Sequence, residues 1–368
     1  MRILFTGGGT GGHIYPALAM AQLIQQRKRD AEIIFVGTDR GLERELVPKA
    51  GFKLKKVAAA GLKRRLVKAN LGVFAANAYG FFQALKVVHK FKPHVVVGTG
   101  GYVTVPVILA SVCLRKPIIL HEQNVLPGLA NKILSQFANC VALSYEQSAA
   151  HFKRARRVVI TGNPVRPAIW QQSREQGRHN LDIKANARFV LVFGGSRGAR
   201  PITEAAVAAA ERLLLDPRLT LLIVTGRADF VTIEEKVRHL GIQASRAGKM
   251  LLRPYMYNME DALAAADIVV TRAGATTLAE ITARGLPAVL IPSPYVTANH
   301  QEYNARTLAD SGAAVMIKEQ DLSPRVLADT IQSLLADPQR LVQMGAAARS
   351  LGRRNAAEIL VQEILKFT

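Results

Sequence analysis

The chain has 368 residues, of which 49% are hydrophobic, and a formal net charge of +22 at pH 7. That apolar content excludes an intrinsically disordered chain, and the length favours two domains over one. Only two cysteines are present, Cys113 and Cys140, which excludes a disulfide scaffold and a cysteine-based zinc cluster. The N-terminal apolar stretch is too short for a secretory signal, so we expect a reducing, cytoplasmic setting.

The first half of the chain alternates short apolar runs with helical patterns. We expect a helix at Ala17–Arg27 and strands at Arg2–Thr6, Glu32–Gly37, His94–Gly98, Pro117–His121 and Asn139–Leu143. Strands separated by helices predict a parallel sheet with right-handed crossovers. The uncharged run Val95–Leu114 is long enough to cross a bilayer, but its glycines and Pro106 favour a buried strand, a turn and a short helix.

The positive charge is concentrated in the first half. Residues 1–164 carry a net charge of +17 and residues 165–368 only +5. A basic run precedes an uncharged stretch, Ala69–Leu85, with helical periodicity; the run comprises Lys53, Lys55, Lys56, Lys63, Arg64, Arg65 and Lys68. We expect the core face of this helix to contain Leu71, Phe74, Ala78, Phe81, Phe82, Leu85 and Val88, with Val73, Ala76 and Val87 outside it.

Three interpretations of this basic and apolar region remain open. It is a core helix beside a solvated loop, a peripheral contact with an anionic membrane, or a nucleic-acid surface. The membrane interpretation combines lysines attracted to anionic lipid with apolar side chains that enter the headgroup boundary. It is favoured over nucleic acid, because aromatic residues interleaved with the basic ones and a known binding motif are both missing.

The second half repeats the α/β theme after a predicted linker, which spans the segment Thr161–Pro167 and the polar stretch Gln171–Asn180. Helices are expected from Ile202, Thr276 and about Gln301, and strands at Phe189–Phe193, Leu221–Thr225, Ile268–Thr271 and Ala288–Ile291. Two such units form a pseudo-repeat, and we expect two facing sheets with a cleft between them. The predicted domains are 1–164, 165–345 and a C-terminal helix, 346–368, that packs back towards the first domain.

Glycine-rich loops follow the first strand of each half, at Gly7–Gly12 and Gly194–Gly198. Small residues there let backbone N–H groups approach an anion at a helix start, although the G-x-G-x-x-G pattern is weak by itself. In Arg272–Glu280, Gly274 permits a tight turn and Thr276 or Thr277 caps a helix. Glu280 then either accepts two hydrogen bonds from a ribose diol or only stabilises the helix dipole.

Motifs for a serine nucleophile, a zinc protease and a metal-holding D-x-D are all missing from the sequence. We therefore predict no metal and no cofactor. Helix ends, Arg166, Ser196 and Arg197 would then stabilise a departing diphosphate.

Taken together, six motifs resemble the MurG family of peptidoglycan glycosyltransferases, in that family's order over about residues 3–305. They are Gly8–His13, Gly100–Val103, His121–Asn124, Gly162–Arg166, Gly194–Ala199 and Gly274–Glu280. The resemblance implies an α/β GT-B fold of two Rossmann-like, doubly wound parallel-sheet domains. It also implies inverting transfer of GlcNAc from UDP-GlcNAc to lipid I (undecaprenyl-pyrophosphoryl-MurNAc-pentapeptide), which forms lipid II for cell-wall biogenesis and division.

The resemblance also implies roles for individual residues. Donor binding falls to Gly9, Thr10, Gly11, Asn124, Arg166, Ser196, Met256, Gly274, Ala275, Thr276, Thr277, Leu278, Ala279, Glu280 and Gln301, with His300 and Asn304 facing the GlcNAc hydroxyls. His13 is the candidate base, and Glu122 orients it or acts in its place. An imidazole that only positions the loop is the alternative for His13.

The family is attached peripherally to the cytoplasmic face of the inner membrane, and the resemblance therefore implies an anionic membrane surface and cell-wall synthesis proteins as partners, without nucleic acid. Two other classes stay open at this point. One is a different GT-B enzyme that uses UDP-sugars, such as another lipid glycosyltransferase or a UDP-GlcNAc epimerase. The other is a basic, non-catalytic nucleotide-binding protein.

Overall fold

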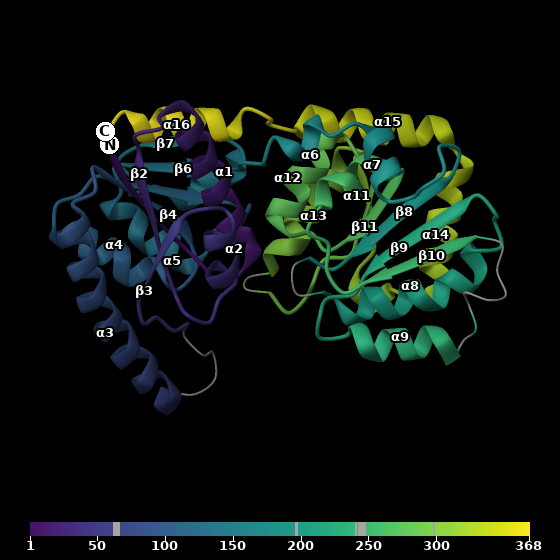
Figure 1. Cartoon of the computed structure of the whole chain (residues 1–368), viewed down its shortest axis with the longest axis horizontal. Coiled ribbons are helices and arrows are strands. Elements are labelled where there is room, and N and C mark those ends of the chain that lie inside the picture. The colour runs from purple at the N-terminus through teal and green to yellow at the C-terminus, as the bar shows by residue number, and fades with distance from the viewer. Residues whose placement is uncertain (62–66, 196–197, 240, 242–247, 297–298) are drawn as a thin grey trace. The chain divides into compact units, whose positions relative to one another are not determined.

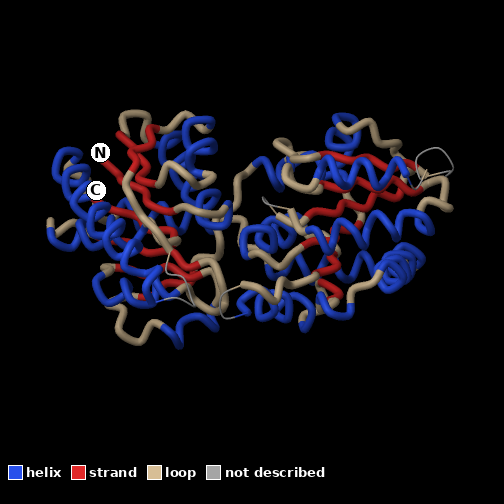
Figure 2. The backbone as a smooth tube through the Cα atoms, turned by 90° about the horizontal axis from the view of Figure 1, so that it is seen from below, coloured by secondary structure: helices blue, strands red, loops and turns tan. Residues whose placement is uncertain are grey.

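The computed structural model describes residues 1–61, 67–195, 198–239, 241, 248–296 and 299–368, and for 67–71 the backbone only. The chain divides into two compact units. Unit 1 comprises Met1–Val165 together with Arg353–Thr368, and unit 2 comprises Arg166–Gly352. Each unit is built on one parallel sheet with helices around it (Figures 1 and 2).

Unit 1 has a seven-stranded sheet in the order β3-β2-β1-β4-β5-β6-β7, with every pair parallel. Its strands are β1 (Arg2–Gly7), β2 (Glu32–Gly37), β3 (Lys53–Lys56), β4 (Val95–Gly100), β5 (Ile118–Glu122), β6 (Cys140–Leu143) and β7 (Val158–Ile160). Its helices are α1 (Gly11–Arg27), α2 (Glu43–Lys49), α3 (Val67–Phe91), α4 (Thr104–Cys113), α5 (Leu129–Leu134) and α16 (Ala356–Leu365), with short 3-10 turns η1 (Ser135–Phe137) and η2 (Glu146–His151).

The two faces of this sheet carry separate cores. Val95, Val96 and Val97 of β4 are all fully buried, because a parallel strand is covered on both faces. One face packs against α1 and α16, the other against α3 and α4. The C-terminal helix α16 thus lies beside α1, near the start of the chain (Figure 1).

Unit 2 has a six-stranded parallel sheet in the order β10-β9-β8-β11-β12-β13. Its strands are β8 (Arg188–Phe193), β9 (Leu219–Val224), β10 (Lys249–Arg253), β11 (Ile268–Thr271), β12 (Ala288–Leu290) and β13 (Ala314–Met316). Its helices are α6 (Ala168–Gln171), α7 (Arg174–Asn180), α8 (Arg200–Leu213), α9 (Phe230–His239), α11 (Met259–Ala265), α12 (Ala275–Arg284), α13 (His300–Asp310), α14 (Pro324–Ala336) and α15 (Pro338–Leu351), with the turn η4 (Glu319–Asp321).

The parallel α/β class predicted from the sequence is confirmed, and the strand predictions fall within the observed sheets. Four strands were missed: β3, β7, β10 and β13 are short, and the lysines of β3 and β10 hide their apolar pattern. Helix α1 begins at Gly11, six residues before the expected start, because Gly11 and Gly12 adopt helical conformations directly after the loop.

Two boundary predictions are wrong. The polar stretch Gln171–Asn180 is not a linker, because most of it forms α7, which Ser173 caps through its side chain and which packs on α11. Residues 346–352 do not belong with the terminal helix, because α15 continues to Leu351 and packs on α12 in unit 2. The chain returns to unit 1 at Arg353.

The predicted core face of α3 is right only in part, because Val88 is buried and Phe81 and Leu85 pack against the core. Phe74 and Phe82, expected in the core, are 63% and 66% exposed, whereas Val73, expected outside it, is buried with Ala84 and Val88. The inward face instead presents Asn77, Gly80 and Gln83 to the chain that follows β3. Asn77 bonds to both the N–H and the carbonyl of Ala60, and Gln83 accepts from the N–H of Ala58. Hydrogen bonds to the backbone therefore add to apolar packing in orienting this helix.

Gly80 and Gly72 of α3 provide a matched pair of substitutions. A Cβ at Gly80 would lie 1.7 Å from the carbonyl oxygen of Ala58, whereas at Gly72 it would meet no atom within 4 Å. We expect Gly80→Ala to lower the free energy of unfolding by about 1–3 kcal/mol, because the overpacked backbone must move. Gly72→Ala should raise it by roughly 0.5–1 kcal/mol, because alanine favours the helix. Urea unfolding measures both, and equal effects would contradict this packing of α3.

Candidate active site

In each unit the predicted site residues follow the carboxyl ends of strands. Strand order reverses between β1 and β4 in unit 1, and between β8 and β11 in unit 2. Ligands of doubly wound sheets bind at such switch points. The loops that begin at Gly8 and Gly101 flank the first switch point, and those that begin at Gly194 and Arg272 flank the second.

At the first switch point, His13 lies on the opening turn of α1. Its Nδ1 is 3.0 Å from the carbonyl oxygen of Gly8 and 3.4 Å from Oγ1 of Thr10. A carbonyl only accepts, so Nδ1 carries the proton and Nε2 presents its lone pair. The loop itself carries Gly9 with φ +83°, exposed Thr10 as the extended N-cap, and buried Gly11 as the first helical residue.

Glu122, at the end of β5, holds a loop and forms no hydrogen bond to His13 among the described residues. Its Oε1 accepts from the backbone and side-chain nitrogens of Asn124, at 3.0 and 3.1 Å. Its Oε2 accepts from the N–H of Gly128 and from Asn131, at 3.1 and 2.9 Å. Four donors thus occupy the buried carboxylate, which fixes Asn124 and the loop rather than the imidazole.

His121, next to Glu122, is buried and structural. Burial lowers the pKa of its imidazole to about 4, against a smaller raising effect of its bond to the Gly162 carbonyl. The neutral ring links β5 to the Gly162 motif, because Nε2 lies 3.2 Å from the Gly162 oxygen. Of the two histidines in these motifs, only His13 presents a ring nitrogen without a hydrogen-bond partner in the described chain.

The sequence interpretation missed Glu43, the first residue of α2, which is 1% exposed. It accepts from the N–H of Gly9 at 3.0 Å and from the N–H and hydroxyl of Thr38 at 3.0 and 2.7 Å. An acid in the first turn of a helix looks ordinary in the sequence, so no pattern marks this one. Its bond to the N–H of Gly9 ties the glycine loop to the start of α2.

At the second switch point, the turn after β11 leads directly into α12. Gly274, with an extended backbone, is the N-cap, so Thr276 and Thr277 lie in the first turn instead of capping the helix as predicted. The side chains of Ala275, Thr276 and Leu278 are buried, and Thr277 and Ala279 are partly exposed. A ligand at this helix start therefore meets mainly backbone N–H groups and the Thr277 side chain.

Glu280, one turn further, is partly buried beside Arg166 and Glu260. Burial raises the pKa of Glu280 to about 7, Arg166 acts to lower it, and Glu260 acts to raise it further. Arg166 is itself paired with Glu260 at 3.4 Å, so its charge is shared between two carboxylates. No described residue donates a hydrogen bond to Glu280, which suits an acceptor for two hydroxyls of a ligand.

Helix α13 carries three of the predicted site residues, and one of them is buried. Asn304 is fully buried and donates to the Ala273 carbonyl at 3.2 Å, so it supports the turn before α12. Gln301 accepts from the N–H of Ser293 at 2.9 Å through Oε1, which leaves its Nε2 side to face a ligand. His300 is partly exposed at the first position of the helix, after Asn299 with φ 53°.

Met256 is partly buried in the segment after β10. Its neighbours Tyr255 and Tyr257 form an edge-to-face pair with centroids 4.9 Å apart. The Arg227 guanidinium lies 5.2 Å from the Tyr255 ring centre and bonds to the Tyr257 hydroxyl at 2.5 Å. Arg227 follows β9, and the two tyrosines follow β10, so they lie at the carboxyl edge of the sheet on the far side of β8 from β11. The predicted residues Ser196 and Arg197 lie outside the described residues.

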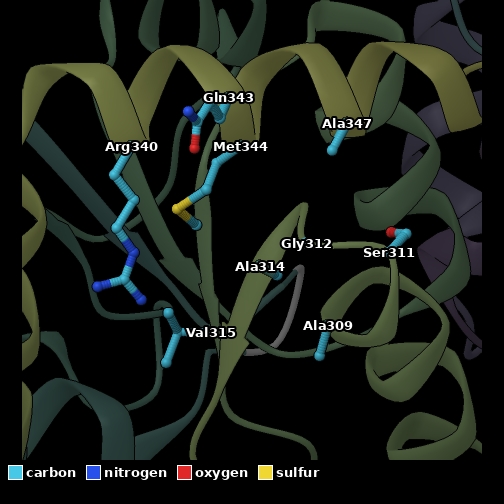
Figure 3. Close-up of a pocket in the computed structure, with 9 residues that line it drawn as sticks. All are labelled: Ala309, Ser311, Gly312, Ala314, Val315, Arg340, Gln343, Met344 and Ala347. Carbon is cyan, nitrogen blue, oxygen red and sulfur yellow. The ribbon is translucent and has the colours of Figure 1, made fainter.

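A separate cavity of about 410 Å³ lies at the opposite end of β13 (Figure 3). It is bounded by the end of α13, the start of β13 and the inner side of α15, and Arg340 is its charged side chain. Since Gly312 and Ala314 precede or begin the strand, this cavity lies at the amino end of the sheet. None of the predicted site residues lines it.

Among the residues that the structure describes, no group of three or more His, Cys, Asp or Glu residues is placed to hold a metal ion. None of the described helices is long and apolar enough to cross a membrane.

Comparisons with known proteins identify the relatives of this chain. Residues 3–143 match the glycosyltransferase family 28 N-terminal domain, and residues 189–360 match its C-terminal domain. The UDP-N-acetylglucosamine–N-acetylmuramyl-(pentapeptide) pyrophosphoryl-undecaprenol N-acetylglucosamine transferase of Moorella thermoacetica is 45% identical over 366 residues, covering 100% of this chain and 99% of that protein.

Solved structures agree with these matches. The crystal structure of Acinetobacter baumannii MurG superposes with a TM-score of 0.76 at 26% identity, covering 99% of each chain. A putative UDP-N-acetylglucosamine 2-epimerase from Listeria monocytogenes superposes with a TM-score of 0.73 over 100% of this chain and 97% of that one, but at 14% identity. The second likeness shows a shared fold alone.

The raised pKa of Glu280 predicts a particular dependence of stability on pH. The folded protein keeps a proton on this carboxyl up to about pH 7, whereas the unfolded chain loses it near pH 4.5. The contribution to stability is therefore present below pH 4.5 and is lost as the pH rises to 7. The loss amounts to at most roughly 3 kcal/mol.

We expect Glu280→Gln to gain stability relative to the parent as the pH rises from 5 to 8. Urea unfolding at both pH values measures the difference, and Glu234→Gln, which removes an exposed carboxylate of the same unit, is the matched control. If the free energy of unfolding of Glu280→Gln changed with pH just as that of the parent does, the raised pKa of Glu280 would be refuted.

Proposed function

The chain belongs to glycosyltransferase family 28, and we propose that it transfers N-acetylglucosamine from UDP-GlcNAc to the lipid-linked acceptor lipid I, forming lipid II. Its two parallel sheets with interleaved helices form the GT-B fold expected from the sequence. The observation that carries the proposal is the Glu280 carboxylate beside the Gly274 turn, on a chain that matches the named transferase over its whole length.

The donor side of the reaction falls to unit 2. The N-terminus of α12 offers N–H groups and a positive dipole end to the diphosphate. Glu280 accepts from the ribose hydroxyls once it is ionised, and Gln301 and His300 face the GlcNAc hydroxyls. Arg166, paired with Glu260, lies near enough to influence Glu280 and adds positive charge beside the uridine.

The acceptor side falls to unit 1, with His13 as the general base. Nε2 of His13 takes the proton of the acceptor hydroxyl while that oxygen bonds to C1 of GlcNAc. The bond between C1 and the diphosphate oxygen breaks, and UDP leaves with the electron pair, so the anomeric centre inverts. The fixed Nδ1 proton supports this assignment, because it leaves the lone pair on the outer nitrogen.

We further propose that α3 attaches the protein peripherally to the cytoplasmic face of an anionic membrane. Phe74, Tyr79 and Phe82 are 63%, 62% and 66% exposed on one helix. Exposed lysines of β3 and of α3, including Lys53 and Lys86, lie in the same basic region of the sequence. Aromatic side chains that enter the headgroup boundary beside lysines that attract anionic lipid suit such a contact.

An epimerase remains the second candidate that the fold allows, since the Listeria structure shares it. The two functions differ in their need for an acceptor: an epimerase releases UDP without one. The 45% identity to a named transferase over the whole chain favours transfer.

The proposed transfer is tested by release of UDP from UDP-GlcNAc with and without a lipid I analogue. We expect release that depends on the acceptor, and a product that contains GlcNAc. Glu280→Ala should raise the KM for UDP-GlcNAc by about 10- to 150-fold, because it loses charge-assisted bonds to the ribose. The KM for the acceptor should stay within about twofold. Release without acceptor would favour the epimerase instead.

The membrane proposal is tested by sedimentation with vesicles that contain anionic phospholipid. Phe74→Ser combined with Phe82→Ser removes two exposed side chains without opening the core, so the variant should fold and leave the vesicles. The matched control is Val342→Ser, which changes a side chain 73% exposed on α15. Turnover of a water-soluble acceptor should persist in both variants. Undiminished sedimentation of the double variant would leave α3 as an ordinary surface helix.

A further inference from the structure

The peptide group between Gly8 and Gly9 is hydrogen-bonded on both sides. Its N–H, from Gly9, donates to Oε2 of Glu43 at 3.0 Å. Its carbonyl, from Gly8, accepts from Nδ1 of His13 at 3.0 Å. Both groups belong to one planar, resonance-stabilised unit. We propose that Glu43 is a positioning residue that acts on His13 through this peptide group, an inference that rests on the proposed role of His13 in the transfer.

The hydrogen bonds around Glu43 suit an ionised carboxylate. Oε1 accepts from the N–H of Thr38 at 3.0 Å and from its hydroxyl at 2.7 Å, while Oε2 accepts from Gly9. A carboxylate only accepts, whereas a carboxylic acid or an amide also carries donors. The described residues form no salt bridge with Glu43. A buried charge is tolerated only where donors replace its hydration, and here those donors belong to the loop that carries the base.

The loops are shaped around this side chain. A Cβ at Gly8 would lie 2.5 Å from Oε1 of Glu43, at Gly37 2.6 Å from its Cγ, and at Gly41 1.9 Å from its Oε2. All three positions therefore require glycine so that backbone can surround the carboxylate. This close enclosure fixes the direction of the bond from Gly9 to Glu43.

The imidazole is held equally closely from the other side. A Cβ at Gly100 would lie 3.0 Å from Cδ2 of His13, and one at Gly101 would lie 3.1 Å from Nδ1. Both glycines have positive φ, 103° and 87°, which lets the turn after β4 approach the ring. The carbonyl of Gly8 fixes the tautomer, and the turn fixes the ring plane.

The connection becomes most effective when the base is protonated. As Nε2 receives the proton of the acceptor hydroxyl, positive charge spreads over the ring and strengthens the bond from Nδ1 to Gly8. The negative charge of Glu43 polarises the peptide in the same direction, since consecutive hydrogen bonds reinforce one another. Glu43 itself neither gains nor loses a proton. The arrangement resembles the carboxylate behind a catalytic histidine, with one peptide group inserted between them.

Glu43→Gln tests this inference, because it keeps the shape but places an NH₂ group where only acceptors fit. We expect kcat for the acceptor-dependent reaction to fall by about 10- to 100-fold. The KM for UDP-GlcNAc should change by less than about twofold, since Glu280, the proposed ribose contact, lies in unit 2. The matched control is Glu45→Gln, which removes the same charge from an exposed position on α2.

A second variant separates positioning from simple support. Thr38→Val removes the hydroxyl bond to Oε1 but keeps the bond from Gly9 to Oε2. It should lower the melting temperature while kcat falls by less than about threefold. If Thr38→Val lowers kcat as far as Glu43→Gln does, or if Glu43→Gln keeps the parent kcat, the inference is overturned.

The tautomer of His13 gives a readout that needs neither turnover nor a variant at position 43. Ring-nitrogen NMR of the ¹⁵N-histidine-labelled protein, with the His13 signals assigned through His13→Gln, should show a neutral ring with Nδ1 protonated and Nε2 bare. A neutral ring protonated at Nε2 would overturn the inference even if Glu43→Gln fails to fold. Failure of the transferase assay with the expected tautomer intact would instead count against the proposed function.

Discussion

Both sheets are parallel throughout, and this constraint decides where chemistry can lie in each unit. Parallel strands place all their carboxyl ends at one edge, and the reversal of strand order opens a gap between two neighbouring loops there. In unit 1 that gap lies between the loops after β1 and β4, and His13 fills it. In unit 2 it lies between the loops after β8 and β11, beside the start of α12. The same folding rule therefore prepares the proposed acceptor site in unit 1 and the proposed donor site in unit 2.

Buried carboxylates give these loops their shape. Glu122 takes four donors from Asn124, Gly128 and Asn131, and Glu43 takes three from Gly9 and Thr38. An irregular loop lacks the regular backbone hydrogen bonds of a helix or sheet, and a buried N–H group without a partner costs free energy. Each carboxylate accepts from such groups and so replaces the missing bonds. Rigid loops of this kind hold a base or a hydrogen-bonding side chain in place before any ligand arrives.

The sequence predicted the parallel sheets and the motif loops because apolar β-branched runs and glycine turns are local signals. It could not predict Glu43, because its partners at Gly9 and Thr38 meet it only after the sheet has formed. Part of the core face of α3 was predicted wrongly for a related reason. Asn77 and Gln83 point inward, where they form hydrogen bonds with the backbone of Ala60 and Ala58. Periodicity assigns polar residues outward, so it placed Phe74 and Phe82 inside.

The contrast between Glu43 and Glu280 shows how one residue type serves two purposes. Glu43 accepts hydrogen bonds from Gly9 and Thr38, and these bonds hold the loop. Glu280 has no donor among the described residues and only a shared cation nearby, so burial raises the pKa of its carboxyl to about 7. Two ribose hydroxyls would donate the hydrogen bonds that Glu280 does not receive from the described residues, and such bonds favour the ionised carboxylate. In the proposed complex with UDP-GlcNAc, nucleotide binding and loss of that proton are therefore coupled.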